Sequence, residues 1–215
     1  MAQPDRGPLR RHHRPALPGD QAIVAIAGGV DPSAVQEAAH AAASALVHGS
    51  RAAADPAVTA RVVTLAQDEG LEVLAELWAD APADSLAGAL WRLYVLRTWV
   101  QRSRVSVARQ FAEGRRFAPV LEVVAGVADP PGPEEVAAVL DAVLTGVSTG
   151  DFAVTLDRAA AFCRIVAVGR AHTADDPRVD PAAGPALTLS AARLVRTAEQ
   201  LETVANRWRA GELNR

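Results

Sequence analysis

DSLAGALWRLYVLRTWVQRSRVSVARQFAEG, residues 84–114, carries the strongest helical pattern of the chain. At 3.6 residues per turn, its large apolar side chains fall within an arc of roughly 100°. They are Leu86, Leu90, Leu93, Val100, Val107 and Phe111. An apolar arc of this width is typical of a helix that packs one face on a core. The segment forms either one helix or two, with the break near residues 101–103.

The same periodicity predicts helices on both sides of this segment. They cover residues 31–49, 58–65, 71–78, 118–127, 133–147, 151–170 and 186–210. Asp31 and Pro32 suit the N-cap and first position of one helix, and Gly211 suits the end of the last. Strand patterns are nearly absent. The expected fold class is therefore all-α, a bundle of about seven or eight helices.

Proline, glycine and like charges set the expected domain boundaries. Residues 1–20 have almost no apolar side chains to bury, so they are expected to form a disordered, flexible basic tail. Residues 21–215 then form a single helical domain, in which the Pro-rich linker 129–133 is a candidate break between subdomains. Residues 171–185 are polar and Pro-rich, which predicts an exposed loop.

The composition excludes several classes of protein. Half of the 215 residues are apolar, which is enough for a sizeable core, and the net charge of −3 argues against a protein that binds polyanions over its whole surface. No uninterrupted apolar run approaches the length of about 18 residues that a membrane span requires. The lone Cys163 cannot form an internal disulfide, which favours the reducing cytoplasm, and its apolar neighbours predict a buried thiol.

Charge alternates along the middle of the chain. Residues 66–90 hold six acids and no base, residues 91–117 hold seven arginines and one acid, and residues 118–157 hold seven acids and no base. The arginines are Arg92, Arg97, Arg102, Arg104, Arg109, Arg115 and Arg116. A basic helical segment is therefore flanked by acidic neighbours.

Two interpretations of the basic segment are open. In one, Arg102, Arg109 and Arg116 repeat every seven residues and bind phosphates on one face. Trp91 and Trp99 then stack on bases. In the other, the arginines pair with carboxylates of adjacent helices, and the tryptophans belong to the core or to a protein interface. We favour internal pairing, because the flanking acids would repel a polyanion.

Motifs of known chemistry are incomplete in this sequence. Glu37 and His40 match one Glu-x-x-His element of a di-iron site, but the second element is missing. The acidic series from Asp68 to Asp84 is interrupted by glycine and proline, which disfavours convergence on one cation. No catalytic residue, metal ligand or cofactor is predicted, and an enzyme is the less favoured expectation.

Three segments resemble uncharacterised all-helical proteins of actinobacteria. They are AGALWRLYVLRTWVQRSRVSVARQF (87–111), VVAGVADPPGP (123–133) and TGDFAVTLDRAAAFCR (149–164). The resemblance covers residues 60–210 and implies an all-helical fold. It implies no activity and no functional residues.

The leading hypothesis is a cytoplasmic helical protein that acts through protein–protein contacts without catalysis, with a homodimer as one form of such contact. Its candidate binding residues are Trp91, Trp99, Arg102, Arg109 and Arg116. The alternative is a nucleic-acid-associated regulator that uses the same arginines and the basic tail. A third hypothesis is a small-molecule-binding protein with a cavity between its helices.

Overall fold

The computed structural model describes residues 31–52, 57, 64, 70–117, 132–144, 151–175, 180 and 182–213. Residues 33–215 group into one unit, and residues 1–32 group into another. The contacts given below lie within residues 33–215. Several predictions lie outside the described residues. They are the tail 1–20, the helices 58–65 and 118–127, and most of the linker 129–133.

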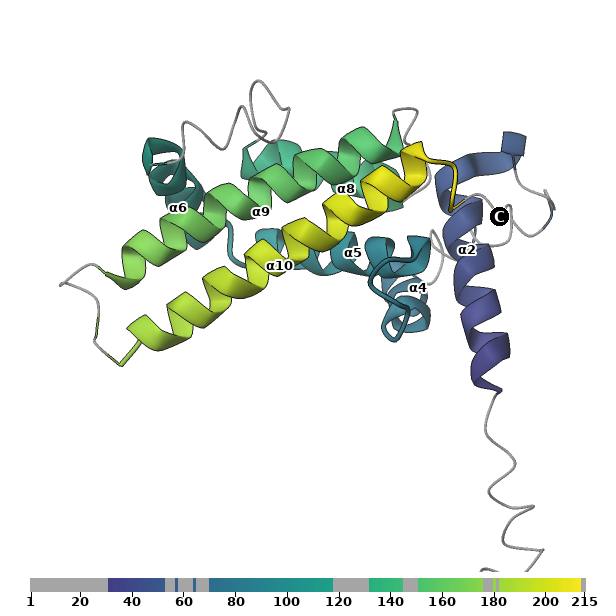
Figure 1. Ribbon diagram of the computed structural model, residues 1–215, viewed down its shortest axis with the longest axis horizontal. Coiled ribbons are helices and arrows are strands. Elements are labelled where there is room, and N and C mark those ends of the chain that lie inside the picture. Colours follow the sequence, from purple (N-terminus) through teal and green to yellow (C-terminus); the bar gives the residue numbers. More distant parts are fainter. Residues whose placement is uncertain are drawn as a thin grey trace, which may run out of the picture. The chain divides into compact units, whose positions relative to one another are not determined.

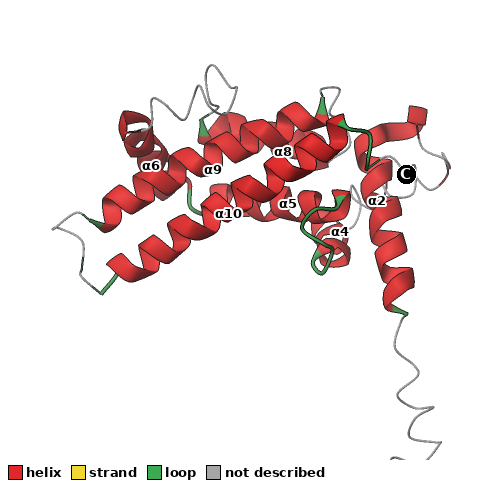
Figure 2. Cartoon of the chain, in the orientation of Figure 1, coloured by secondary structure: helices red, strands yellow, loops and turns green. Residues whose placement is uncertain are grey.

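The described part of the chain consists of helices and short connections, without strands (Figure 2). The helices are α2 (Pro32–Ala52), α4 (Leu71–Trp78), α5 (Leu86–Arg102), α6 (Arg104–Phe117), α8 (Pro133–Leu144), α9 (Phe152–Ala174) and α10 (Gly184–Arg209). The predicted all-α class is confirmed. Of the two alternatives for residues 84–114, the structure has two helices, because Ser103 separates α5 from α6 with φ −123° and ψ 30°.

The helix α9 occupies the centre of the fold. Figure 1 shows α9 and α10 side by side and running in opposite directions, and α6 and α8 also pack against α9. Because neighbouring helices cover α9 on several sides, its buried residues surround the helix and do not form a single stripe. Phe162, Ile165 and Val166, for example, are each at most 1% exposed. A helix that is apolar all round is typical of a buried position.

The backbones of α6 and α9 touch where each helix has a glycine. A Cβ atom at Gly169 would lie 1.8 Å from the carbonyl oxygen of Gln110, and one at Gly114 would lie 1.9 Å from that of Ile165. No side chain other than hydrogen fits at such distances. This close approach places Gln110 of α6 against the residue that follows Gly169, which is Arg170.

Trp78 at the end of α4 joins that helix to α2. Its side chain is 0% exposed, and its Nε1 donates a hydrogen bond of 3.2 Å to the carbonyl oxygen of Ala39. Further along α2, His48 stacks on Trp208 of α10 with the ring centroids 4.9 Å apart. The aromatic contacts therefore tie α2 to α4 and to α10.

The predicted loop 171–185 is wrong over its first residues, because α9 continues to Ala174. Contacts with α6 extend the helix. The His172 ring stacks on Phe117 with centroids 4.0 Å apart, and its Nδ1 lies 3.6 Å from a carboxylate oxygen of Glu113. At the other end of the predicted loop, α10 begins at Gly184 rather than at residue 186. The expected helix end at Gly211 is confirmed by its φ of +72°.

Candidate functional site

A groove of about 500 Å³ lies between α5 and α10, and part of α9 contributes to it. We call it the α5–α10 groove. Its apolar lining comes from Trp91, Val95, Leu96, Trp99 and Leu194, and its polar lining from Arg92, Arg170, Ser190, Arg193, Thr197 and Gln200. The structure thus brings the two predicted tryptophans, Trp91 and Trp99, into one site, where both are half-buried.

Arg170 is the most buried charged residue that lines this groove. Arg170 is only 9% exposed. Its Nε and Nη2 donate to the Gln110 side-chain oxygen at 3.1 and 2.9 Å, and its Nη1 donates to the Ser190 hydroxyl. The guanidinium also lies over the Trp99 ring, 4.9 Å from the centroid. All of these partners are neutral, and burial lowers the pKa of Arg170.

Two more arginines line the groove. Arg92 is half-buried, and it donates from Nε to Gln200 and from Nη1 to the Gly88 carbonyl, both at 2.6 Å. Burial lowers the pKa of Arg92 as well. Arg193 is exposed. The described residues that line the groove therefore supply three guanidinium groups and no carboxylate.

The three predicted arginines lie elsewhere, on the outside of α6 and at the end of α5. We call this surface the arginine face, and it consists of Arg102, Val105, Arg109, Ala112 and Arg116, all of them exposed. Within α6 these positions lie opposite the buried residues Val107, Gln110, Phe111 and Gly114. Val105 is 86% exposed, so the face combines an apolar side chain with positive charge.

Within the described part of the chain, the expected pairing of the central arginines with an acidic helix is found at Arg97. Arg97 of α5 forms an ion pair with Asp141 of α8. Arg116 pairs with Glu113 of its own helix at 3.3 Å. For Arg102 and Arg109, the described residues offer no acidic partner, so the expected neutralisation finds no support there.

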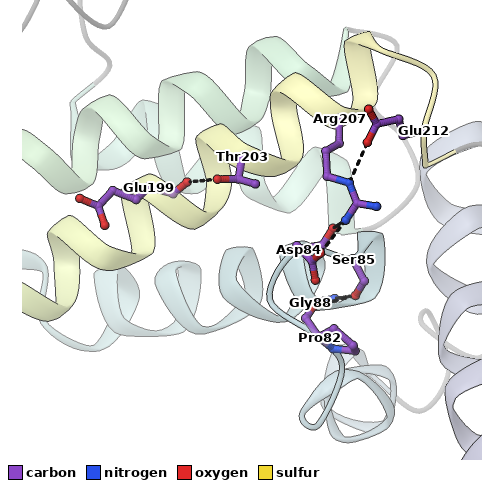
Figure 3. Close-up of polar contacts among 8 residues, drawn as sticks. All are labelled: Pro82, Asp84, Ser85, Gly88, Glu199, Thr203, Arg207 and Glu212. Carbon is purple, nitrogen blue, oxygen red and sulfur yellow. Dashed lines mark hydrogen bonds and ion pairs between the residues drawn. The ribbon is translucent and has the colours of Figure 1, made fainter.

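Asp84 and Asp157, one from each acidic stretch, pair instead with arginines of α10. Arg207 of α10 donates from Nη1 to the carboxylate and the carbonyl oxygen of Asp84, both at 2.7 Å, and from Nε to Glu212 at 3.1 Å (Figure 3). Arg164 of α9 makes a two-point pair with Glu202 at 2.9 and 2.6 Å. Charge order along the sequence therefore did not identify this partner of Asp84, because Arg207 lies 123 residues further along the chain.

Sequence reasoning missed Arg92, Arg170 and Arg193 as groove residues. Arg92 was counted in the basic segment, but nothing in the sequence distinguished it from its neighbours. Arg170 lies 60 residues from Gln110, its hydrogen-bond partner. The only local signal was Gly169, since a glycine inside a helix marks a place of close backbone approach.

Other chemistry is limited in the described part of the chain. No three side chains of His, Cys, Asp or Glu converge as metal ligands there. No helix among the described residues has the length and apolar character to cross a bilayer. A second pocket of about 850 Å³, between α8 and the α5–α6 pair, has both acids and arginines in its lining, for example Glu135 and Arg104.

Cys163 is buried, and burial raises the pKa of its thiol to about 12. Because the thiolate is the reactive form, we expect the native protein not to react with a disulfide reagent that labels thiols at mildly alkaline pH. The same reagent should label one thiol per chain in denaturant. The reagent releases a chromophore when it reacts, and the absorbance of this chromophore measures the labelling of the native and of the denatured protein. Rapid labelling of the native protein would contradict the burial of Cys163.

Comparison with models of protein families, with curated proteins and with solved structures gave no match.

Proposed function

We propose that this chain acts by binding another protein through the arginine face. The observation that supports this proposal is the exposure of Val105, at 86%, beside Arg109. Phe117, at the C-terminal end of the same helix, is 50% exposed. Arginine and aromatic residues are enriched at protein interfaces, and apolar side chains there lose their contact with water.

The charge of the arginine face favours an acidic partner. Arg102 and Arg109 have no acidic partner among the described residues, so their positive charge is available to a second molecule. The net charge of −3 does not cancel this local field, because exposed charges farther away than about 8 Å are largely screened at physiological ionic strength. The partner is either a different protein with an acidic, apolar segment or a second copy of this chain. We place the interaction in the cytoplasm, where a lone cysteine stays reduced.

Nucleic acid is the second candidate, and a specific observation favours it. A phosphate-binding surface needs arginines that are not already neutralised, and Arg102 and Arg109 meet this condition within the described part of the chain. The number of such arginines is small, however, and each neutralised phosphate contributes only one released counterion. We therefore rank protein binding first.

Photo-crosslinking from the arginine face tests the proposal. A photoreactive amino acid at position 105 is compared in cells with the same amino acid at position 189, because Leu189 of α10 is also exposed, at 64%, but lies outside the arginine face. We expect one discrete protein adduct from position 105 and none from position 189. This adduct should disappear in the Arg102/Arg109/Arg116→Ala variant. Equal adducts from both positions, or none from position 105, would contradict the proposal.

A gel-shift assay separates the nucleic-acid alternative. The purified protein is titrated into duplex DNA and single-stranded RNA at low salt and at about 0.15 M salt. We expect no binding of either at the higher salt. Binding that falls steeply with salt, and that the triple alanine variant loses, would replace protein binding with nucleic-acid binding.

A further inference from the structure

We infer that the α5–α10 groove binds a small amphipathic carboxylate, whose charged end lies at Arg170 and whose apolar body lies along Trp91 and Trp99. This inference goes beyond the proposed function, because the groove and the arginine face share no residue. It concerns the third predicted class, a small-molecule site between helices, and it assigns a ligand chemistry to that site.

Arg170 carries a buried positive charge, and its partners among the described residues are neutral. A buried cation is normally compensated by a carboxylate, because an uncompensated buried charge is strongly unfavourable. Among the described residues, the partners of Arg170 are Gln110, Ser190 and the Trp99 ring, none of them anionic. A bound anion would supply the charge that the described part of the protein does not.

The Arg170 guanidinium has N–H donors that Gln110 and Ser190 do not use. A guanidinium has five N–H donors. Arg170 uses three of them, two on Gln110 and one on Ser190. Two donors remain, and a carboxylate accepts two parallel hydrogen bonds from a guanidinium. A phosphate monoester has three terminal oxygens, one more than these two donors can reach, so the donor count favours the carboxylate.

Two further arginines of the groove add to the positive electrostatic field around Arg170. Arg92 and Arg193 line the same groove, and none of the described residues that line it is acidic. Like Arg170, Arg92 donates only to neutral oxygens, those of Gln200 and Gly88. In a partly desolvated groove such charges act on an anion more strongly than in water.

Apolar side chains of α5 and α10 line the rest of the groove. Trp91, Val95 and Trp99 follow one another at intervals of four residues on α5, and this row extends for about 12 Å at 1.5 Å per residue. Leu194 of α10 lines the opposite side. The volume of about 500 Å³ is in the range of pockets that hold small organic ligands. A ligand with one charge and an apolar body fits this combination.

The probe pair for the test is octanoate and 1-octanol, which have the same chain length and differ in charge. Isothermal titration of the full-length protein measures both, and octyl phosphate serves as a third probe. We expect octanoate to bind at least about tenfold more tightly than octanol, as one charged hydrogen-bonded contact provides. Equal binding of octanoate and octanol, tighter binding of octyl phosphate, or no octanoate binding below about 1 mM would overturn the inference.

Two arginines of α10 provide a matched pair of variants. Arg193 lines the groove, whereas Arg196, three residues further on, is exposed and does not. We expect Arg193→Gln to weaken octanoate binding by about two- to fivefold, the effect of one exposed charge, and Arg196→Gln to leave it unchanged. Equal effects of the two variants would overturn the inference.

Arg170 itself is tested in a variant that is designed to fold. Arg170→Met alone leaves the buried Gln110 side chain without its partner, so we combine it with Gln110→Leu. This double variant should lose octanoate binding by at least about 30-fold and keep its weak affinity for octanol. If octanoate binding were retained in the folded double variant, the carboxylate would not be at Arg170.

Discussion

Replacing Trp78 by alanine is expected to lower the free energy of unfolding by about 3–5 kcal/mol, the usual range for loss of a large buried aromatic side chain. Trp78 is 0% exposed and bridges α4 and α2 through its hydrogen bond to Ala39. The substitution leaves a cavity and removes this hydrogen bond between α4 and α2 at the same place. Denaturant titration followed by circular dichroism measures the change.

Trp91 is the matched control for Trp78. It is half-buried in the α5–α10 groove and stacks on Tyr94 with the ring centroids 5.9 Å apart. Because part of its surface already contacts water, Trp91→Ala should cost clearly less than Trp78→Ala. If the two variants were equally stable, α4 would not be anchored on α2 through Trp78.

The second large effect is expected from Gly169→Ala. The added Cβ would lie 1.8 Å from the Gln110 carbonyl oxygen, so α6 and α9 must separate. Overpacking of this kind costs about 1–3 kcal/mol, and the contact with rigid backbone places this variant at the upper end. The higher helix propensity of alanine offsets only about 1 kcal/mol. The midpoint of denaturant unfolding should therefore fall.

Gly184→Ala is the control for this substitution. A Cβ at Gly184 would lie 3.4 Å from the Ala174 carbonyl oxygen, an ordinary contact distance, and the position is the first of α10. We expect its unfolding midpoint to remain near that of the wild type. A Gly169→Ala variant that unfolds like Gly184→Ala would show that the α6 and α9 backbones do not meet.

Much of the fold follows from apolar periodicity and helix-end residues. The helices α4 (Leu71–Trp78) and α8 (Pro133–Leu144) begin where the pattern predicts them, α10 (Gly184–Arg209) begins two residues earlier, and the break lies at Ser103 as expected. The end of α9 was not predictable in this way. Residues 171–174, Ala-His-Thr-Ala, have no large apolar side chain, and their helical form depends on Phe117 and Glu113, which are far away in sequence.

The candidate site was predictable only in part, for the same reason. Aromatic residues are few, so the sequence singled out Trp91 and Trp99, and both line the groove. Arg170 was not found, because its role depends on a contact between α6 and α9 that a helical pattern does not contain. Periodicity predicts which face of a helix is buried, but it does not predict which helix lies against that face.

The position of Gly169 next to Arg170 connects the fold with the groove. The close approach of α6 and α9 at Gly169 brings the Gln110 side chain to the Arg170 guanidinium. This arrangement keeps the charge in place without a carboxylate. We therefore expect Gly169→Ala, where it remains folded, to weaken octanoate binding as well as stability.

The most direct test of this assignment of Arg170 is the free energy of unfolding of Arg170→Met with Gln110→Leu, measured by denaturant titration without ligand. If the guanidinium serves an anion and not the fold, replacing it and its neutral partner by apolar side chains of similar length should leave the stability within about 1 kcal/mol of the wild type, or raise it. A loss of about 3 kcal/mol or more would show that Arg170 is a structural residue and would contradict its assignment to a ligand.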